Sequence, residues 1–193
     1  MKKIYFALFL LPILLNSCSS VYSYYSAILD TTESPTIKVE NCNNHFNDEF
    51  IDIVWNVSDK AFGFVLENKT KQSLKINWND ISYVDMNGYV DRVIHQGVKL
   101  INKNSESQIP TTLPGNSKIS DILVPTKNIS WWSGGSWNYE CLIKCETCLK
   151  RDINYTDTSY YFGKTMKILF PIEIGGEKKD YNFEFIINEK KIR

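Results

Sequence analysis

The sequence lacks an excess of charge of either sign. Its 22 lysines and arginines balance 22 aspartates and glutamates, and its basic runs are no longer than pairs such as Lys178-Lys179. Proteins that bind nucleic acid carry a basic patch or stripe, because they must neutralise phosphates. We therefore predict that nucleic acid is not a partner.

The N-terminal apolar run is too short to cross a bilayer, which takes about 20 apolar residues. This run covers residues 4–15 and follows the cationic start Met1-Lys2-Lys3. A short cationic segment followed by an apolar run of about a dozen residues is typical of a secretory signal peptide. We therefore expect the chain to be exported.

The residues after this run are Leu15-Asn16-Ser17-Cys18, and they resemble the lipobox of bacterial lipoproteins. The resemblance implies cleavage between Ser17 and Cys18, and acylation of Cys18 on its thiol and on the new amino group. Several acyl chains on one residue give stable anchoring at a membrane. Ser19 looks like the default residue for sorting to the outer membrane, if the organism has two membranes. The alternative is an ordinary secreted protein in which Cys18 has no lipid.

Helical patterns are also lacking, because no window shows the periodicity of an amphipathic helix of three turns. Apolar residues make up 43% and aromatic residues 13% of the chain, and they favour strands. We expect a signal peptide at residues 1–17, a lipid-anchored tether at 18–40, and one all-β domain at 41–193. A single antiparallel β-sandwich is the expected architecture, with a β-barrel as the competitor.

About eight or nine strands are expected, from short alternating or apolar runs separated by turn residues. In one run, Leu74, Ile76 and Trp78 alternate and should share a buried face. Asn87-Gly88 lies between two alternating segments and predicts a hairpin with a type I′ turn. The expected strands cover residues 50–55, 62–68, 74–78, 97–101, 119–124, 166–170 and 181–187, with a hairpin over 83–91.

About a third of the chain shows a further pattern of apolar, aromatic and turn residues. This pattern resembles small uncharacterised bacterial lipoproteins with an immunoglobulin-like sandwich, and it contains no catalytic motif. The resemblance implies that fold alone. The residues that carry it are Phe64 to Trp78, Asp85, Gly88, His95-Gln96-Gly97-Val98, Pro110 and Pro114-Gly115.

Without Cys18, four cysteines remain: Cys42, Cys141, Cys145 and Cys148. An even number in an exported protein predicts two disulfides, with the pairing left open. The C-x3-C-x2-C spacing of 141–148 also resembles the cluster motif of radical S-adenosylmethionine enzymes, and four thiolates could bind zinc. Both alternatives need a reducing compartment, which the export signal argues against. We predict no metal and no cofactor.

The sequence is poor in catalytic signals. Histidine occurs only at positions 45 and 95, and no serine lies in a Gly-x-Ser-x-Gly elbow. We expect His95 to cap or pack near the turn at Gln96-Gly97 and predict no catalytic residue. Asp85, Asn87 and Asp91 faintly resemble a calcium loop, but the terminal glutamate is missing, so a hairpin turn is the favoured interpretation.

The aromatic segment 131–139 is the candidate binding surface, through Trp131, Trp132, Trp137 and Tyr139 around Gly134-Gly135. Tryptophan and tyrosine are favoured in binding surfaces, although these side chains could instead cover one end of the sandwich. We expect a membrane-anchored envelope lipoprotein that acts as a non-catalytic binding or structural module for an envelope protein or a glycan. The alternatives are an envelope hydrolase acting on glycans, and an assembly or inhibitor protein that binds by strand addition or through this segment.

Overall fold

The computed structural model describes residues 25–30, 44–104, 107–142 and 161–189 of the 193-residue chain. These residues form thirteen β-strands and two short 3-10 helices, and no α-helix occurs among them. The strands are β1 (Tyr25–Asp30), β2 (His45–Asn47), β3 (Ile51–Val57), β4 (Phe62–Asn68), β5 (Leu74–Ile76), β6 (Ser82–Val84), β7 (Val90–His95), β8 (Thr111–Leu113), β9 (Ser117–Pro125), β10 (Ile129–Trp132), β11 (Ser136–Tyr139), β12 (Thr165–Ile174) and β13 (Glu177–Glu189). The 3-10 helices are η1 (Leu100–Asn102) and η2 (Thr126–Asn128).

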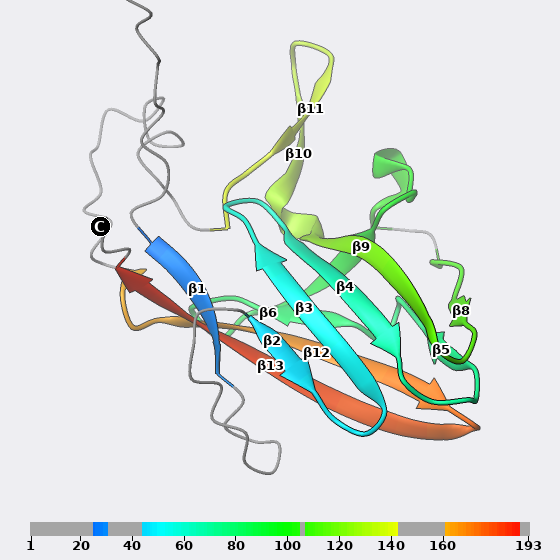
Figure 1. Cartoon of the computed structure of the whole chain (residues 1–193). Coiled ribbons are helices and arrows are strands. Elements are labelled where there is room, and N and C mark those ends of the chain that lie inside the picture. The colour runs from blue at the N-terminus through cyan, green and yellow to red at the C-terminus, as the bar shows by residue number, and fades with distance from the viewer. Residues whose placement is uncertain (1–24, 31–43, 105–106, 143–160, 190–193) are drawn as a thin grey trace, which may run out of the picture.

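The strands pack as an antiparallel, sandwich-like all-β fold (Figure 1). One continuous sheet runs in the order β1-β13-β12-β6-β7-β9-β4-β3-β2, with β5 and β8 attached beside β12, and β10 and β11 form a separate hairpin. β7 belongs to both layers, because Val90 pairs with Val84 of β6 whereas Val93 pairs with Pro125 of β9. The expected fold class is confirmed.

The long strands lie where alternation predicts them. β4, β9, β12 and β13 cover their expected segments, and β3 covers its segment except for Phe50. The strand expected at 74–78 ends at Ile76, although Leu74, Ile76 and Trp78 are all fully buried. The expected strand at 97–101 is wrong. Gly97 has a φ of +95° and ends β7 in a turn, after which residues 100–102 form η1. Val98 and Leu100 are apolar because they pack against a small cluster around Ile94, not because they alternate in a sheet.

The structure also differs at residues 25–30, which were expected within the tether. These residues form β1, which pairs antiparallel with β13 from Tyr25 opposite Glu189 to Asp30 opposite Glu184. An edge strand leaves a row of unpaired backbone groups, so a segment that covers the edge of β13 satisfies them. The sheet therefore begins well before residue 41.

The main core lies between the two layers and is rich in aromatic rings. Trp55 of β3 is its centre, with ring centroids 5.1–6.1 Å from the rings of Phe64, Phe170, Phe183 and Phe185. Alternation along β3, β4 and β13 directs these side chains inward, as the period of a half-buried strand requires. The core therefore joins strands of both layers.

The hairpin at Asn87-Gly88 forms, but its turn type differs from the prediction. Gly88 has a φ of +84°, whereas Asn87 does not have a positive φ, so the turn is not type I′. The Asp85 carboxylate accepts hydrogen bonds from the backbone N–H groups of Asn87 and Tyr89, which stabilises a longer loop. Positive φ at both central residues occurs instead at Gly175-Gly176, between β12 and β13.

A hydrogen bond fastens the two layers on the side away from β7. The Tyr181 hydroxyl of β13 donates to Oδ2 of Asp48, which precedes β3, at 2.8 Å. Burial raises the pKa of Tyr181 above its ordinary value, and the bond to the Asp48 carboxylate raises it further. Burial also raises the pKa of the Tyr83 phenol. Both phenols therefore hold their protons more tightly in the folded protein than in the unfolded chain.

We expect the folded protein to lose stability in alkali. A raised phenol pKa contributes stability that is fully present below about pH 10 and is lost as the pH rises further, by up to about 1.4 kcal/mol per pH unit for each phenol. Urea unfolding measured from about pH 9 upward should show this fall. Tyr181→Phe should make it shallower, whereas Tyr89→Phe, at an exposed position, should leave it unchanged. An equal slope in all three proteins would contradict the assignment.

Candidate functional site: an aromatic hairpin at one end of the sandwich

The aromatic segment folds as a regular β-hairpin. Trp131 of β10 lies opposite Trp137 of β11, and Trp132 lies opposite Ser136. The N–H of Gly135 donates to the carbonyl oxygen of Trp132 at 2.9 Å, and Gly135 has a φ of +87°. A three-residue loop with a left-handed glycine is a common hairpin connection, so the sequence Ser133-Gly134-Gly135 suits this turn.

Gly134 lies against the Trp132 ring. A Cβ atom at position 134 would be 2.7 Å from the nearest ring carbon, closer than real side chains allow. The absence of a side chain at Gly134 therefore leaves room for the Trp132 indole beside the turn. The ring lies beside the turn, and most of the Trp132 side chain stays exposed.

The base of the hairpin packs on the sandwich through a second, small apolar cluster. Ile129 is buried with Ile94 and Val124, and the partly buried Trp137 ring packs against them. The Trp131 ring then meets the Trp137 ring edge to face, with centroids 5.2 Å apart and planes at 74°. Ile129 and Trp137 hold the hairpin on the sandwich; Tyr139 lies opposite Ile129 at the base, and Trp131 and Trp132 lie nearer the turn.

Three of the four aromatic candidates are open to solvent. Trp131 is 59% exposed, Trp132 is 60% exposed and Tyr139 is 39% exposed. The alternative in which the tryptophans cover the end of the sandwich describes Trp137 alone. Figure 1 shows β10 and β11 projecting beyond the strands of the sandwich. Large aromatic side chains with this much exposed surface on one projecting element are characteristic of interaction sites.

A cleft of about 350 Å³ lies beside the base of the hairpin, lined among others by Tyr83, Met86, Lys127 and Leu142. Asp85 and Asp91, the carboxylates of the calcium-like segment, also line it. Asp85 accepts bonds within its own turn, and Asp91 accepts from the Thr126 hydroxyl and from the backbone N–H of Lys127. These contacts support the interpretation of the segment as a hairpin turn.

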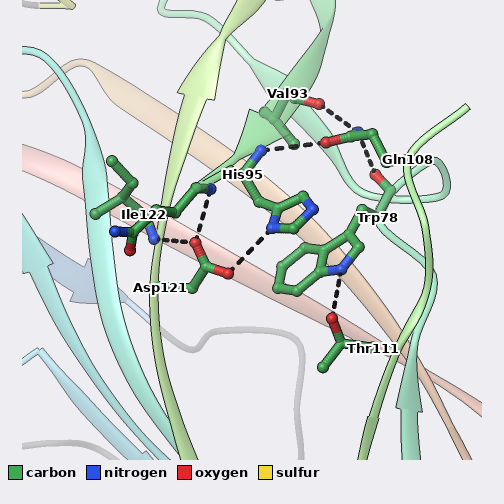
Figure 2. Close-up of polar contacts among 8 residues, drawn as sticks. Trp78, Val93, His95, Gln108, Thr111, Asp121 and Ile122 are labelled. Atoms are coloured by element: carbon green, nitrogen blue, oxygen red, sulfur yellow. Dashed lines mark hydrogen bonds and ion pairs between the residues drawn. The ribbon is translucent and has the colours of Figure 1, made fainter. Parts of the chain in front are cut away.

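The other polar feature that stands out is a network around His95 (Figure 2). The His95 ring stacks on the Trp78 indole with centroids 4.1 Å apart and planes 7° from parallel. Its Nδ1 lies 3.1 Å from Oδ2 of Asp121. Oδ1 of Asp121 accepts from the N–H groups of Gln96 and Ile122. The side chains of His95 and Asp121 are only 16% and 9% exposed.

Gln108 closes this network from the opposite side. Its Nε2 donates to the carbonyl oxygens of Trp78 and Val93, and its Oε1 accepts from the N–H of His95. Nε1 of Trp78 donates to the Thr111 hydroxyl. His95 lies near the turn at Gln96-Gly97, as expected, whereas Asp121 and Gln108 were not predicted because neither lies in a motif. The network satisfies buried polar groups where β7 changes layers.

His45 has a carboxylate partner as well. Its Nε2 lies 2.8 Å from Oδ1 of Asp52, on the neighbouring strand. Burial opposes ionisation of Asp52, but hydrogen bonds from Asn47 and His45 outweigh it and hold the pKa of that carboxyl below its ordinary value. The pair is half-exposed and joins β2 to β3. Its geometry is that of a surface contact between strands.

Of the cysteines predicted to pair, only Cys141 lies in the described residues, with its sulfur 3.7 Å from Oδ2 of Asp59. Cys42, Cys145 and Cys148 lie outside them, as does Cys18, so the disulfides and the lipid anchor stay predictions. Within residues 25–30, 44–104, 107–142 and 161–189, no group of three potential metal ligands occurs. No helix in the same part of the chain is long and apolar enough to span a membrane.

No family model matches the chain, and no curated protein matches it. The chain is similar to a solved structure described as "X-ray structure of Northeast Structural Genomics Consortium target SoR45". The two share 10% identity over 86% of this chain and 85% of that one, with a TM-score of 0.31. The feature of the chain itself that indicates a function is the projecting aromatic hairpin.

Proposed function

We propose that this chain is a lipid-anchored lipoprotein of the cell envelope whose sandwich acts as a non-catalytic binding or structural module. The observation that supports a binding role is the projecting hairpin with exposed Trp131, Trp132 and Tyr139. Aromatic side chains bury large areas at a low entropic cost, which suits them to contact surfaces. The lipobox-like segment ending at Cys18 supports the anchor.

The contacts of the titratable groups favour binding over catalysis. His95 and Asp121 are almost buried, and both Asp121 oxygens already accept hydrogen bonds. Asp85 and Asp91, the carboxylates beside the cleft, hold backbone N–H groups in the same way. A glycan hydrolase needs one carboxyl group as an acid and a second as base or nucleophile, both facing the substrate. These carboxylates instead stabilise turns and strand ends.

The anchor is tested by the intact mass of the mature protein purified from membranes. We expect an N-terminal Cys18 with the added mass of its acyl chains. Cys18→Ser should abolish the added mass and release the protein from the membrane fraction, because a chain without acyl groups has no stable anchor. Ser17→Ala keeps a small residue before the cysteine and should behave as the wild type. An unmodified N-terminus at any other residue would rule out the lipoprotein assignment.

A further inference from the structure

The aromatic hairpin lies at the end of the sandwich from which the chain leads back to Cys18. Tyr25, the first residue of β1, pairs with Glu189 at the end of β13. The last part of β13 pairs with the start of β12, which pairs with β6, and the end of β6 pairs with the start of β7. These strand ends therefore lie at the same end of the sheet. Lys127, two residues before β10, donates its backbone N–H to Asp91 of β7 and its Nζ to the Val90 carbonyl.

Figure 1 shows the end of β13 and the start of β1 at the left of the view, and the β10–β11 hairpin projecting upward beyond the strands. We call this end of the molecule the hairpin end. Tyr25 follows Cys18 by only seven residues. A fully extended chain rises at most 3.3–3.6 Å per residue, so these seven residues reach at most about 25 Å. An acylated Cys18 would therefore hold the hairpin end close to the membrane surface.

The hairpin is free of charged residues. None occurs from Asn128 to Tyr139, and Lys127 and Glu140 flank the segment with opposite signs. An ionised side chain is costly to move from water into lipid, whereas the hairpin carries only aromatic, small and amide side chains beyond its base. It can approach the polar boundary of a bilayer without the desolvation of an ion.

Exposed aromatic residues gather at the same end. Trp131, Trp132, Tyr139 and Tyr89 are all exposed. Tyr89 lies in the turn between β6 and β7, beside Val90, which is exposed too. Tryptophan and tyrosine prefer the headgroup region of a bilayer, where an apolar ring and a polar N–H or O–H are both satisfied.

We propose that the β10–β11 hairpin docks on the phospholipid surface that anchors Cys18, with Trp131, Trp132 and Tyr139 in the headgroup region. This inference rests on the proposed function for the anchor, and it names the lipid surface as the partner of the hairpin. Acyl chains alone tether the domain, and the hairpin adds a second contact that fixes its orientation, with the opposite end directed away from the membrane. The stable anchor raises the effective concentration of the hairpin at the membrane surface, so that even a weak contact of the hairpin with lipid is populated.

The test uses the acylated full chain in phosphatidylcholine vesicles that carry nitroxide-labelled lipids, which quench tryptophan fluorescence at short range. Trp55 and Trp78 are buried in the core and should remain unquenched. We expect a nitroxide near the headgroups to quench part of the emission, and W131S/W132S to reduce this quenching several-fold. High salt should leave the quenching unchanged, because the docking segment has no charge to screen.

The matched control is V54S/V65S. Val54 and Val65 form a cross-strand pair on the outer face of β3 and β4, 44% and 43% exposed, away from the hairpin. This variant also removes two exposed apolar side chains, and it should keep the wild-type quenching. Circular dichroism and the urea midpoint confirm that each variant is folded.

The outcomes separate the anchor from the hairpin. An acylated protein that stays on the vesicles with no quenching by lipid nitroxides would overturn the docking inference and leave the anchor intact. Protection of Trp131 and Trp132 by a soluble glycan or a protein, without lipid quenching, would overturn it in the same way. If Cys18 carries no lipid, the anchor fails. Co-sedimentation of the unacylated chain then decides docking: a several-fold loss of vesicle binding in W131S/W132S supports it, and equal binding of both proteins overturns it.

Discussion

Trp55→Ala should destabilise the fold by about 3–5 kcal/mol, the usual cost of truncating a buried tryptophan. Trp55 is almost fully buried, and its ring contacts Phe64 of β4 and three phenylalanines of β12 and β13. The substitution would leave a cavity between the two layers that these strands cannot close without moving. Because small domains are stable by only about 5–15 kcal/mol, the loss should be plain in a urea unfolding curve.

Two further variants test whether the loss comes from the buried ring of Trp55, from any change in this part of β3, or from the indole N–H. Val54→Ala changes the neighbouring, half-exposed residue of the same strand and should cost well under about 1 kcal/mol. Trp55→Phe keeps a ring in the cavity and removes the indole N–H, which is buried and has no acceptor among the described residues. An unpaired buried donor is itself unfavourable, so this variant should lose less than half of what Trp55→Ala loses. Equal losses for Val54→Ala and Trp55→Ala would contradict this account of the core.

The long strands were predictable because their pattern is local. Every second residue of β3, β4 and β13 faces the core, so the alternation is visible in the sequence without knowledge of any partner. β2 and β8 have three residues each, too few to show a period, and they exist because they pair with β3 and β5. The same holds for β1, whose place is set by the open edge of β13.

For the turn at Asn87-Gly88, the position was predictable from the sequence but the turn type was not. The dipeptide correctly marks a chain reversal, since glycine at position 88 adopts a positive φ. The choice between turn types was decided by Asp85, whose carboxylate holds two backbone N–H groups of the loop and favours a longer connection. A rule based on the Asn-Gly dipeptide alone does not take account of Asp85, whose side chain caps the turn from two residues before Asn87.

The candidate site was also only partly predictable from the sequence. The aromatic hairpin was visible from the sequence because its aromatic residues and glycines are neighbours in the chain. The exposure of Trp131 and Trp132 beside the half-buried Trp137 was not visible, because it follows from the packing of the hairpin base on Ile94 and Val124, outside the hairpin. The partner of His95 lies 26 residues away, on another strand. A contact of this kind is set by how β7 crosses from one layer to the other.

Asp121 contacts the end of β7 where this strand crosses between the layers, so its substitution is the second one that should strongly destabilise the fold. Its carboxylate is almost buried and accepts from the N–H groups of Gln96 and Ile122, while Oδ2 faces Nδ1 of His95. A carboxylate oxygen accepts hydrogen bonds, so this contact is a hydrogen bond when the ring proton of His95 is on Nδ1. Asp121→Ala would remove the acceptor of all three donors at once.

We expect Asp121→Ala to lower the free energy of unfolding by about 3 kcal/mol, since each buried donor left unpaired costs about 1–3 kcal/mol. Asp121→Asn keeps one acceptor oxygen for the backbone N–H groups and should lose roughly half as much. Asp180→Ala is the matched control, because Asp180 is exposed and its only ion pair is a 3.9 Å contact with Lys178 among the described residues; it should change stability by less than about 0.5 kcal/mol. Urea unfolding at neutral pH measures all three. If Asp121→Ala were as stable as Asp180→Ala, the Asp121 contacts would not hold β7 between the layers, and the strand pairings alone would have to do so.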